Sequence, residues 1–293
     1  MFAIIGMLIT LGAIIGGFLM EKGKLLVLMQ PAELVIIGGA AIGTLLVANP
    51  VPVVMKIFKG ALGILKPTPY SKAFYVETLK MLNELFSAGR KGGLDKLEGD
   101  IEDPQKSQIF TKYPKFLSNG HAVDFLCDTF RTVISGGVGA FEMDQLMELD
   151  MESHHQEMNV PVAALTTMAD SLPGLGIVAA VLGVVITMGA LGGPPEEIGH
   201  KVAAALVGTF LGILLCYGFF GPIGSYLAKQ NEAEAQYFQC LRVGILALIR
   251  GTAPRLAIEF ARRTIPSDLR PSFKEMEDGC KVTASAPAAQ EAA

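Results

Sequence analysis

The residue types that could handle an ion in this chain are hydroxyls and prolines inside long uncharged stretches. Thr209 lies within one such stretch with Pro222 near its end, and Pro173 lies near the start of another. A proline has no backbone N–H, so it removes one donor and leaves a nearby carbonyl oxygen free. These stretches therefore offer oxygen atoms, but they contain no Asp, Glu, Lys, Arg or His.

The absence of an ionisable side chain restricts what these stretches can do by themselves. Proteins that translocate ions normally keep such a group inside the membrane, because it is costly there and is retained for function. The chain therefore either moves no ions or uses a carboxylate that a partner supplies. Simple helix ends or kinks would also account for Pro173 and Pro222, and a hydrogen bond to its own helix would account for Thr209.

Four uncharged stretches are long enough to cross a membrane. A helix that rises about 1.5 Å per residue needs about 20 apolar residues to span a hydrocarbon core of about 30 Å. The first stretch has neither a basic start nor an Ala-x-Ala cleavage site, so it is predicted to be a span rather than a signal peptide. If the third span enters where the fourth leaves, Pro173 and Pro222 lie at a similar depth. The four predicted spans are Phe2–Met20, Leu34–Met55, Ser171–Pro195 and Val202–Ala228.

The composition argues against several other classes of protein. The 293 residues are 51% hydrophobic and only 18% charged, whereas an average soluble domain has about 25% charged residues. The formal net charge of −4 argues against a nucleic-acid-binding protein. The four cysteines are scattered and no P-loop, G-x-S-x-G or H-E-x-x-H motif occurs, so we predict no enzyme, no metal site and no cofactor. His154 and His155 lack metal-ligand spacing, and we expect them on the solvated surface.

The connections between the spans define the domains. Two transmembrane hairpins, 1–55 and 171–228, flank a polar loop at 56–170. Helical spacing of apolar residues predicts helices in this loop and in a polar segment at 229–270, and no strand signal is present. A disordered tail is predicted for 271–293. The predicted fold is therefore an all-α membrane protein with four transmembrane helices and a large helical cytoplasmic domain.

The distribution of positive charge predicts the orientation. Of the 24 Lys and Arg residues, 12 lie in residues 51–170 and 9 follow residue 228, whereas the two short turns between spans hold three. Lys56, Lys59 and Lys66 follow the second span with no acidic residue among them. The positive-inside rule therefore places the large loop and both termini in the cytoplasm.

Two further patterns leave alternatives open. The pairs Gly12-x3-Gly16 and Gly208-x3-Gly212 allow close helix packing in lipid, either within the chain or against another subunit. The segment 89–104 is dense in charges of both signs. Such a run is usually a solvated face, although it would also suit the electrostatic docking of a partner.

Three short motifs resemble those of a known family. They are an Arg and a Glu eight positions apart before Asp-Ile-Glu-Asp-Pro, a Leu-Pro-Gly that opens the third span, and Val-Gly-Thr-Phe followed by Gly-Pro in the fourth. With four spans and a large loop after the second, residues 1–270 resemble MotA-type flagellar stator subunits of the MotA/TolQ/ExbB proton channel family. The residues concerned are Arg90, Glu98, Leu172–Gly174, Val207–Phe210 and Gly221–Pro222.

The resemblance implies a stator subunit of the bacterial flagellar motor, which is a multi-pass protein of the inner membrane. Members of this family form a ring of five subunits around a dimer of MotB, whose membrane aspartate binds the translocated ion. Proton flow through the resulting channel produces torque on the rotor. By the resemblance, Arg90 and Glu98 engage oppositely charged residues of the rotor switch protein FliG.

The resemblance also implies roles for five residues in the spans. Pro173 and Pro222 match the two prolines that are thought to couple ion binding at the partner aspartate to movement of the cytoplasmic loop. Thr209 matches the threonine of the fourth span that faces the ion site. Ala180 and Tyr217 fall on the same channel-facing side.

The residue at position 180 bears on the choice of ion. Sodium-driven relatives have a threonine seven residues after the third-span proline, where this chain has Ala180, which offers no hydroxyl ligand. We therefore expect a proton rather than sodium. The alternatives are a proton-coupled energiser of the ExbB or TolQ type, a transporter or channel that works alone, and a structural membrane scaffold. The hairpin in residues 1–55 argues against the ExbB or TolQ type, which has three spans.

Overall fold

The computed structural model describes residues 2–63, 68–189 and 191–277, and within these residues it contains helices and no strand. The chain divides into two compact units, which we call the apolar unit and the polar unit. The apolar unit is Met1–Pro67 with Glu157–Gln230, and the polar unit is Thr68–Gln156 with Asn231–Ala293. The predicted all-α fold class is therefore confirmed.

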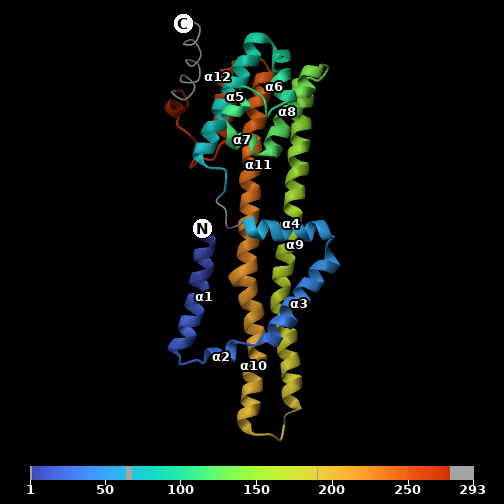
Figure 1. Ribbon diagram of the computed structural model, residues 1–293, viewed down its shortest axis with the longest axis vertical. Coiled ribbons are helices and arrows are strands. Elements are labelled where there is room, and N and C mark those ends of the chain that lie inside the picture. The colour runs from blue at the N-terminus through green and yellow to red at the C-terminus, as the bar shows by residue number, and fades with distance from the viewer. Residues whose placement is uncertain (1, 64–67, 190, 278–293) are drawn as a thin grey trace. The chain divides into compact units, whose positions relative to one another are not determined.

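The apolar unit contains the helices that can cross a membrane (Figure 1). Four helices are long and apolar enough for this, as the sequence predicted. Two of them, α9 (Ala140–Met188) and α11 (Gly221–Ile249, which continues α10), extend from the apolar unit into the polar unit. The helices that lie wholly in the apolar unit are α1 (Phe2–Met20), α2 (Leu25–Leu28), α3 (Pro31–Ala48), α4 (Val51–Gly63) and α10 (Pro195–Leu214).

The second predicted span, Leu34–Met55, is divided between two helices in the structure. α3 ends at Ala48 because Pro50 disfavours helical backbone at the residue before it. Asn49 is accordingly extended, with φ −134° and ψ 142°. α4 then starts at Val51 and runs in a new direction (Figure 1), so the predicted span was too long at its C-terminal end.

The third and fourth predicted spans are parts of longer helices. α9 ends at Met188, and Pro195, which the prediction placed at the end of the third span, is instead the first residue of α10. Proline suits this position because its missing N–H would have no partner in the first turn of a helix. α10 continues through a π-helical segment, η3 (Leu215–Phe220), into α11 and so passes well beyond Ala228.

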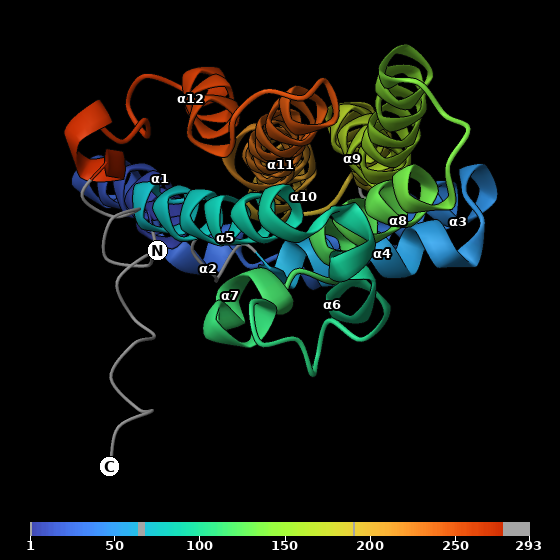
Figure 2. The ribbon, with the colours of Figure 1, turned by 90° about the horizontal axis from the view of Figure 1, so that it is seen from above.

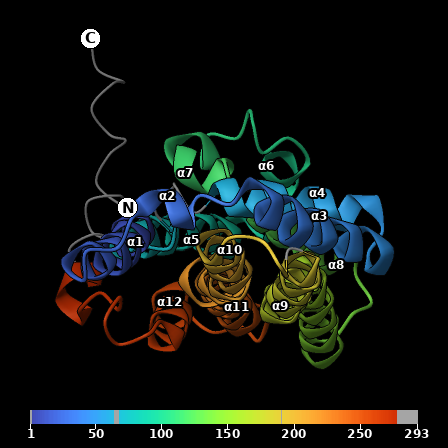
Figure 3. The same ribbon diagram turned by 90° about the horizontal axis from the view of Figure 1, so that it is seen from below.

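α9 and α10 pack against each other through glycines. A Cβ on Gly176 would lie 2.8 Å from the carbonyl oxygen of Gly208, and one on Gly183 would lie 2.6 Å from the Cβ of Ala205. These distances leave no room for a larger side chain, so the two backbones approach as closely as small residues allow. Figure 3 shows the two helices side by side, with α2 and α3 along one side of them.

The structure accounts for one of the two predicted glycine pairs. A Cβ on Gly212 would lie 2.5 Å from the carbonyl oxygen of Leu172, so Gly208 and Gly212 both pack within the chain. Around Gly12 and Gly16, no atom of the described residues lies within 4 Å of the Cβ position. That face of α1 has no packing partner in the described part of a single chain, and its docking against another subunit stays a prediction.

The polar unit is a bundle of helices around an aromatic core. Figure 2 shows α5 with α11 and α12 on one side and α6 and α7 on the other. α5 begins after Ser71, whose Oγ accepts a hydrogen bond from the N–H of Phe74. Phe86, Phe130 and Tyr237 are fully buried in the core. The longer elements are α5 (Lys72–Gly92), α8 (Gly120–Ser135) and α12 (Pro254–Thr264), and the shorter ones are η1 (Leu94–Leu97), α6 (Glu98–Glu102), η2 (Phe110–Lys112) and α7 (Pro114–Leu117).

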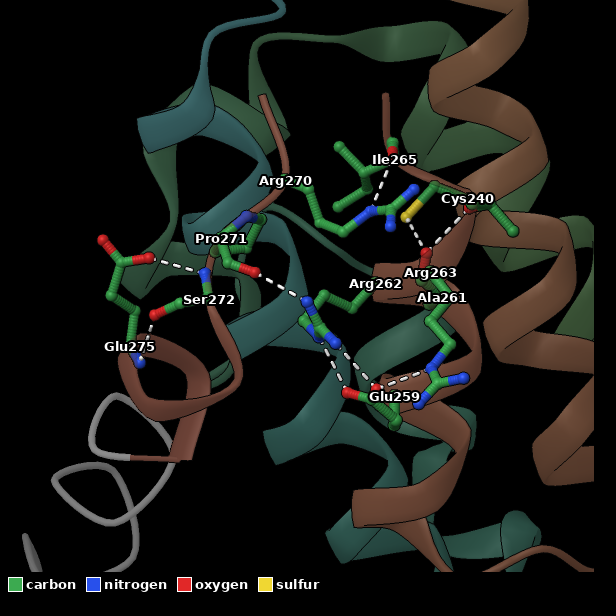
Figure 4. A network of polar contacts seen from close by, with 11 residues as sticks. Cys240, Glu259, Ala261, Arg262, Arg263, Ile265, Arg270, Pro271, Ser272 and Glu275 are labelled. Carbon is green, nitrogen blue, oxygen red and sulfur yellow. Dashed lines mark hydrogen bonds and ion pairs between the residues drawn. The ribbon is translucent and has the colours of Figure 1, made fainter. Parts of the chain in front are cut away.

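The C-terminal part of the polar unit is fastened to α12 by Arg262 (Figure 4). Its guanidinium donates to both oxygens of Glu259 at 2.7 Å and to the carbonyl oxygen of Pro271 at 2.8 Å. The hydrogen bonds from Arg262 lower the pKa of the Glu259 carboxyl to about 2, although burial acts in the opposite direction.

These contacts change two predicted boundaries. The predicted helical segment 229–270 is interrupted after α11, where Gly251 adopts a left-handed φ of +83°. Residues 273–277 are helical and Met276 is buried, so the folded chain continues beyond residue 270. Of the tail that was predicted to be disordered, residues 278–293 lie outside the described residues.

Candidate functional site

The α9–α10 pair brings three of the predicted site residues together. Pro173 follows Leu172, whose carbonyl oxygen lies against Gly212, and Thr209 has its Cα 3.3 Å from a Cβ position on Gly176. The backbone nitrogen of Ala180 lies 3.2 Å from a Cβ position on Gly208, which is the residue before Thr209. Pro173, Ala180 and Thr209 are half-buried. They therefore lie on one helix pair, and their position facing an ion channel stays a prediction.

The hydroxyl of Thr209 is not used by its own helix. Thr10, Thr44 and Thr187 each donate a hydrogen bond to a backbone carbonyl three or four residues earlier. Among the described residues Thr209 makes no such bond. The hydroxyl is therefore available to a ligand or partner, and the simpler explanation of this threonine does not hold in this chain.

Pro222 and Tyr217 lie at an irregular part of the same helix. The N–H of Gly221 donates to the carbonyl oxygen of Cys216, five residues earlier, as in a π-helix. π-helical segments occur often at functional sites and bend a helix, and Pro222 follows directly without a donor of its own. Tyr217 is 72% exposed, and Pro222 is also exposed. The sequence carries no signal that predicts this π-helical segment.

The two prolines do not lie at the same depth along the helix pair. Gly212 packs against Leu172, next to Pro173, whereas a Cβ on Gly224 would lie 3.0 Å from the hydroxyl of Thr166. Pro222, two residues before Gly224 on the antiparallel helix, is therefore level with residues near Met168, about five residues from Pro173 along α9. The similar depth of the two prolines in a membrane therefore stays a prediction.

The apolar unit also contains a carboxylate that was not among the predicted site residues, that of Glu33. α3 begins at Pro31, three residues before the predicted span, and therefore includes Glu33. The Glu33 side chain is 7% exposed, and its Oε2 has no hydrogen-bond partner among the described residues. A proline at the first helical position and an acid in the first turn indicate a helix start, so the signal was present. The helices that can span the membrane are thus not free of acidic residues.

Arg90 and Glu98 lie on neighbouring elements of the polar unit. A Cβ on Gly89 would lie 3.0 Å from Cδ1 of Leu97, so the last turn of α5 packs directly against the end of η1, which leads into α6. Gly93 allows the tight reversal between them through its φ of +85°. Arg90 and Glu98 directly follow the two packed residues. Both are exposed, and neither has an ion-pair partner among the described residues.

The acidic end of the charged segment is used within the chain. Asp100 accepts a hydrogen bond from Ser107, Glu102 pairs with Arg131, and Asp103 pairs with Lys106. These contacts distinguish the acidic end of the segment from Arg90 and Glu98. The two residues that the resemblance singled out are among those left free for a partner.

His154 differs from its prediction. Its side chain is 12% exposed, its ring lies 3.7 Å from that of His121, and its Nε2 lies 3.5 Å from a carboxylate oxygen of Glu234. Burial alone would raise the pKa of Glu234, but the neighbouring His154, Tyr70 and His121 together outweigh burial, and the net shift is downward. His154 is buried because this face of α9 packs against α11 at Phe238, so a surface position is wrong for it. The described residues contain no group of three side chains placed to bind a metal ion.

Two family models match the chain. The model of the motility protein A N-terminal region matches residues 4–93, and that of the MotA/TolQ/ExbB proton channel family matches residues 118–240. Motility protein A of Escherichia coli (strain K12) is 42% identical over 278 residues, which cover 95% of this chain and 94% of the relative. The chain belongs to the motility protein A family. This membership confirms the resemblance and the prediction of a flagellar stator subunit rather than an enzyme.

Two solved structures share the fold of this motility protein A chain. The MotAB structure from C. jejuni has a TM-score of 0.76 and 19% identity, and the comparison covers 92% of this chain and 98% of the other. The flagellar MotAB stator complex from Bacillus subtilis has a TM-score of 0.70 and 24% identity, with 90% and 96% covered. The arrangement of helices described above is therefore that of stator proteins.

Proposed function

We propose that this chain forms a proton channel with MotB, and that proton flow through the channel turns the flagellar rotor. The observation that carries the proposal is the chemistry of the α9–α10 pair and its continuation. Residues 171–195 and 202–228 offer the free hydroxyl of Thr209 and the prolines Pro173 and Pro222, but no acidic or basic side chain. A channel wall of this kind needs a titrating group from another chain. A membrane aspartate of MotB facing the wall would supply it.

The wall favours a proton over sodium. Sodium binds through several oxygen ligands, whereas a proton needs only the carboxylate of the partner. Ala180 lies on the α9–α10 pair beside Gly208 and contributes no side-chain oxygen. Thr209 then provides the one free hydroxyl at this level of the pair among the described residues.

Protonation of the partner aspartate would change the packing of the wall. A charge in apolar surroundings is costly, so its neutralisation removes a strong constraint on the adjacent helices. The wall is least regular at η3 and Pro222, where α10 becomes α11. α11 continues from there into the polar unit, so a bend at this point would carry the change along a single helix. Pro173 would provide a similar point of bending in α9.

The assembly would pass this change to the rotor through Arg90 and Glu98. Their exposure and their lack of partners within the described chain support contact with oppositely charged residues of FliG. We further propose a ring of five copies around a MotB dimer in the bacterial inner membrane. The unpacked glycine face of α1 and the exposed Tyr217 are surfaces that neighbouring chains would cover. Lys56 and Lys59, on α4, support a cytoplasmic position of the large loop and both termini.

Expression in a bacterium without its own stator tests this proposal. Swimming should return when the chain is produced with MotB, and it should not return when the membrane aspartate of MotB is replaced by asparagine. Native mass spectrometry of the purified complex should show five copies of the chain and two of MotB. Swimming with the asparagine variant, or a complex without MotB, would contradict the proposal.

A further inference from the structure

The buried carboxylate of Glu33 reaches the seam between α9 and α10. A Cβ on Gly208 would lie 2.6 Å from Oε2 of Glu33, so the carboxylate occupies space that only glycine leaves open. The same position on Gly208 lies 3.1 Å from the Cβ of Ala179 and 3.2 Å from the nitrogen of Ala180. Oε2 therefore points from α3 toward the α9–α10 pair at Gly208. Thr209 is the residue that follows Gly208.

No charged group stands near enough along the packed helices to balance an ionised Glu33. Residues 171–188 of α9 and 202–214 of α10 contain no acidic or basic side chain, and α2 and the rest of α3 contain none either. The nearest charged residues along these elements are Asp170, nine residues before Ala179, Lys201, seven before Gly208, and the exposed Lys24, which precedes α2 and lies nine residues before Glu33. Lys201 is already paired with Glu197 at 2.9 Å. An ionised carboxylate in this place would be buried without a partner, which is costly.

We propose that Glu33 is a proton-binding site of this chain itself, located behind the wall formed by α9 and α10. It carries a proton when the seam is closed, because the neutral acid is the form that the apolar surroundings accept. The site is distinct from the aspartate expected from MotB, and it lies on a different helix from Pro173, Thr209 and Pro222. Proton binding by Glu33 does not depend on the role of the chain in a motor.

A relay role for Glu33 follows if the proposed channel holds. Gly208 on α10 and Ala180 on α9 lie beside the carboxylate. Ala180 is part of the proposed wall, and Gly208 is adjacent to Thr209 in it. When the packing of the wall changes, a carboxyl at the seam can release its proton toward the side of Thr209 and take up another. Such a carboxyl group speeds proton transfer toward Thr209 most when the proton concentration outside the membrane is low. This step rests on the proposed function, whereas the proton-binding site does not.

Infrared spectroscopy of the purified complex with MotB tests the proton-binding site directly. The wild-type complex at neutral pH should show a carbonyl band of a protonated carboxyl that shifts in D2O, persists when the MotB aspartate is replaced by asparagine, and is missing in Glu33→Gln. Glu33→Asp should move the band rather than remove it. Glu21→Gln, which removes an exposed carboxylate at the end of α1, is the control and should leave the band unchanged. Absence of the band from wild type, or its persistence in Glu33→Gln, would overturn the site.

Proton flux through the same complexes in liposomes tests the relay role. Glu33→Gln should conduct several-fold more slowly than wild type at alkaline outside pH and nearly equally at acidic outside pH. Glu33→Asp should recover part of the loss, which a merely structural role would not produce with this pH dependence. An unchanged pH profile in Glu33→Gln would overturn the relay. If flux occurs without MotB, the proposed function fails while the infrared result still decides whether Glu33 binds a proton.

Discussion

At the scale of single residues, the chain distinguishes polar groups that are satisfied internally from those that are left free. Thr44 donates its hydroxyl to the carbonyl oxygen of Ala41 at 3.0 Å, whereas Thr209 makes no such bond within the described chain. Arg262 and Glu259 are fully paired, whereas Arg90 and Glu98 are exposed without partners. Function is therefore expected where a polar group has no structural use.

Removal of the free hydroxyl should slow proton transfer. We expect Thr209→Val to lower proton flux in the complex with MotB by about fivefold, because one lost hydrogen bond is worth about 1 kcal/mol. Thr209→Ser should restore the flux. Thr44→Val, whose hydroxyl bonds to its own helix, is the control and should conduct like wild type. Equal flux in all three variants would remove Thr209 from the ion path.

The pair formed by Glu259 and Arg262 should give the polar unit a measurable pH dependence. The pKa of Glu259 is lowered to about 2 from 4.5, so its stabilisation is present above pH 4.5 and is lost as the pH falls toward 2. We expect Glu259→Gln to lower the free energy of unfolding by about 2 kcal/mol at pH 7. Thermal unfolding followed by far-UV circular dichroism should show this difference shrinking on acidification. A difference that stays constant with pH would contradict the lowered pKa.

At the scale of helices, the approach of α9 and α10 depends on glycine on both sides. We expect Gly176→Ala to destabilise the apolar unit by about 1–3 kcal/mol, because its Cβ would meet the carbonyl oxygen of Gly208. Gly174→Ala lies on the same helix with nothing within 4 Å, so it should be neutral or slightly stabilising. Thermal unfolding in detergent compares the two variants. Equal midpoints would show that the seam is not closely packed.

The sequence predicted the spans better than it predicted their ends. Runs without charge identify membrane helices, because burial of a charge in lipid is costly. The same rule excluded Glu33 and started the second span at Leu34, although Pro31 marks the true start of α3. Local sequence patterns do not determine how two helices pack against each other. The π-helical turn before Pro222 and the offset between the two prolines depend on this packing. Burial of His154 depends on such packing as well.

At the scale of the whole molecule, the free charges of the polar unit should affect torque without affecting conduction. We expect Arg90→Ala combined with Glu98→Ala to reduce swimming speed strongly while proton flux through the complex stays at the wild-type level. Lys91→Ala combined with Asp95→Ala removes one exposed charge of each sign from the same segment and should swim normally. Normal swimming by the first double variant would count against the rotor contact. The rotation rate of tethered cells compares the torque of the two double variants.

The identities of the binding partners come from family membership and from neither the sequence nor the structure of a single chain. The free Thr209, the exposed Tyr217 and the unpartnered Arg90 each indicate that something binds there, but not what binds. MotB and FliG were inferred from the resemblance, because the sequence of one chain does not identify its partners. The sequence predicted that the chain either moves no ions or uses a carboxylate of a partner, and Glu33 is a further acid, which belongs to this chain.

The central claim is that the channel conducts only when MotB contributes its aspartate. Proton flux into liposomes, followed with a pH-sensitive dye, should be absent for the chain alone and present for the chain with MotB. It should be absent again when asparagine replaces the MotB aspartate. Comparable flux from the chain alone would contradict the account.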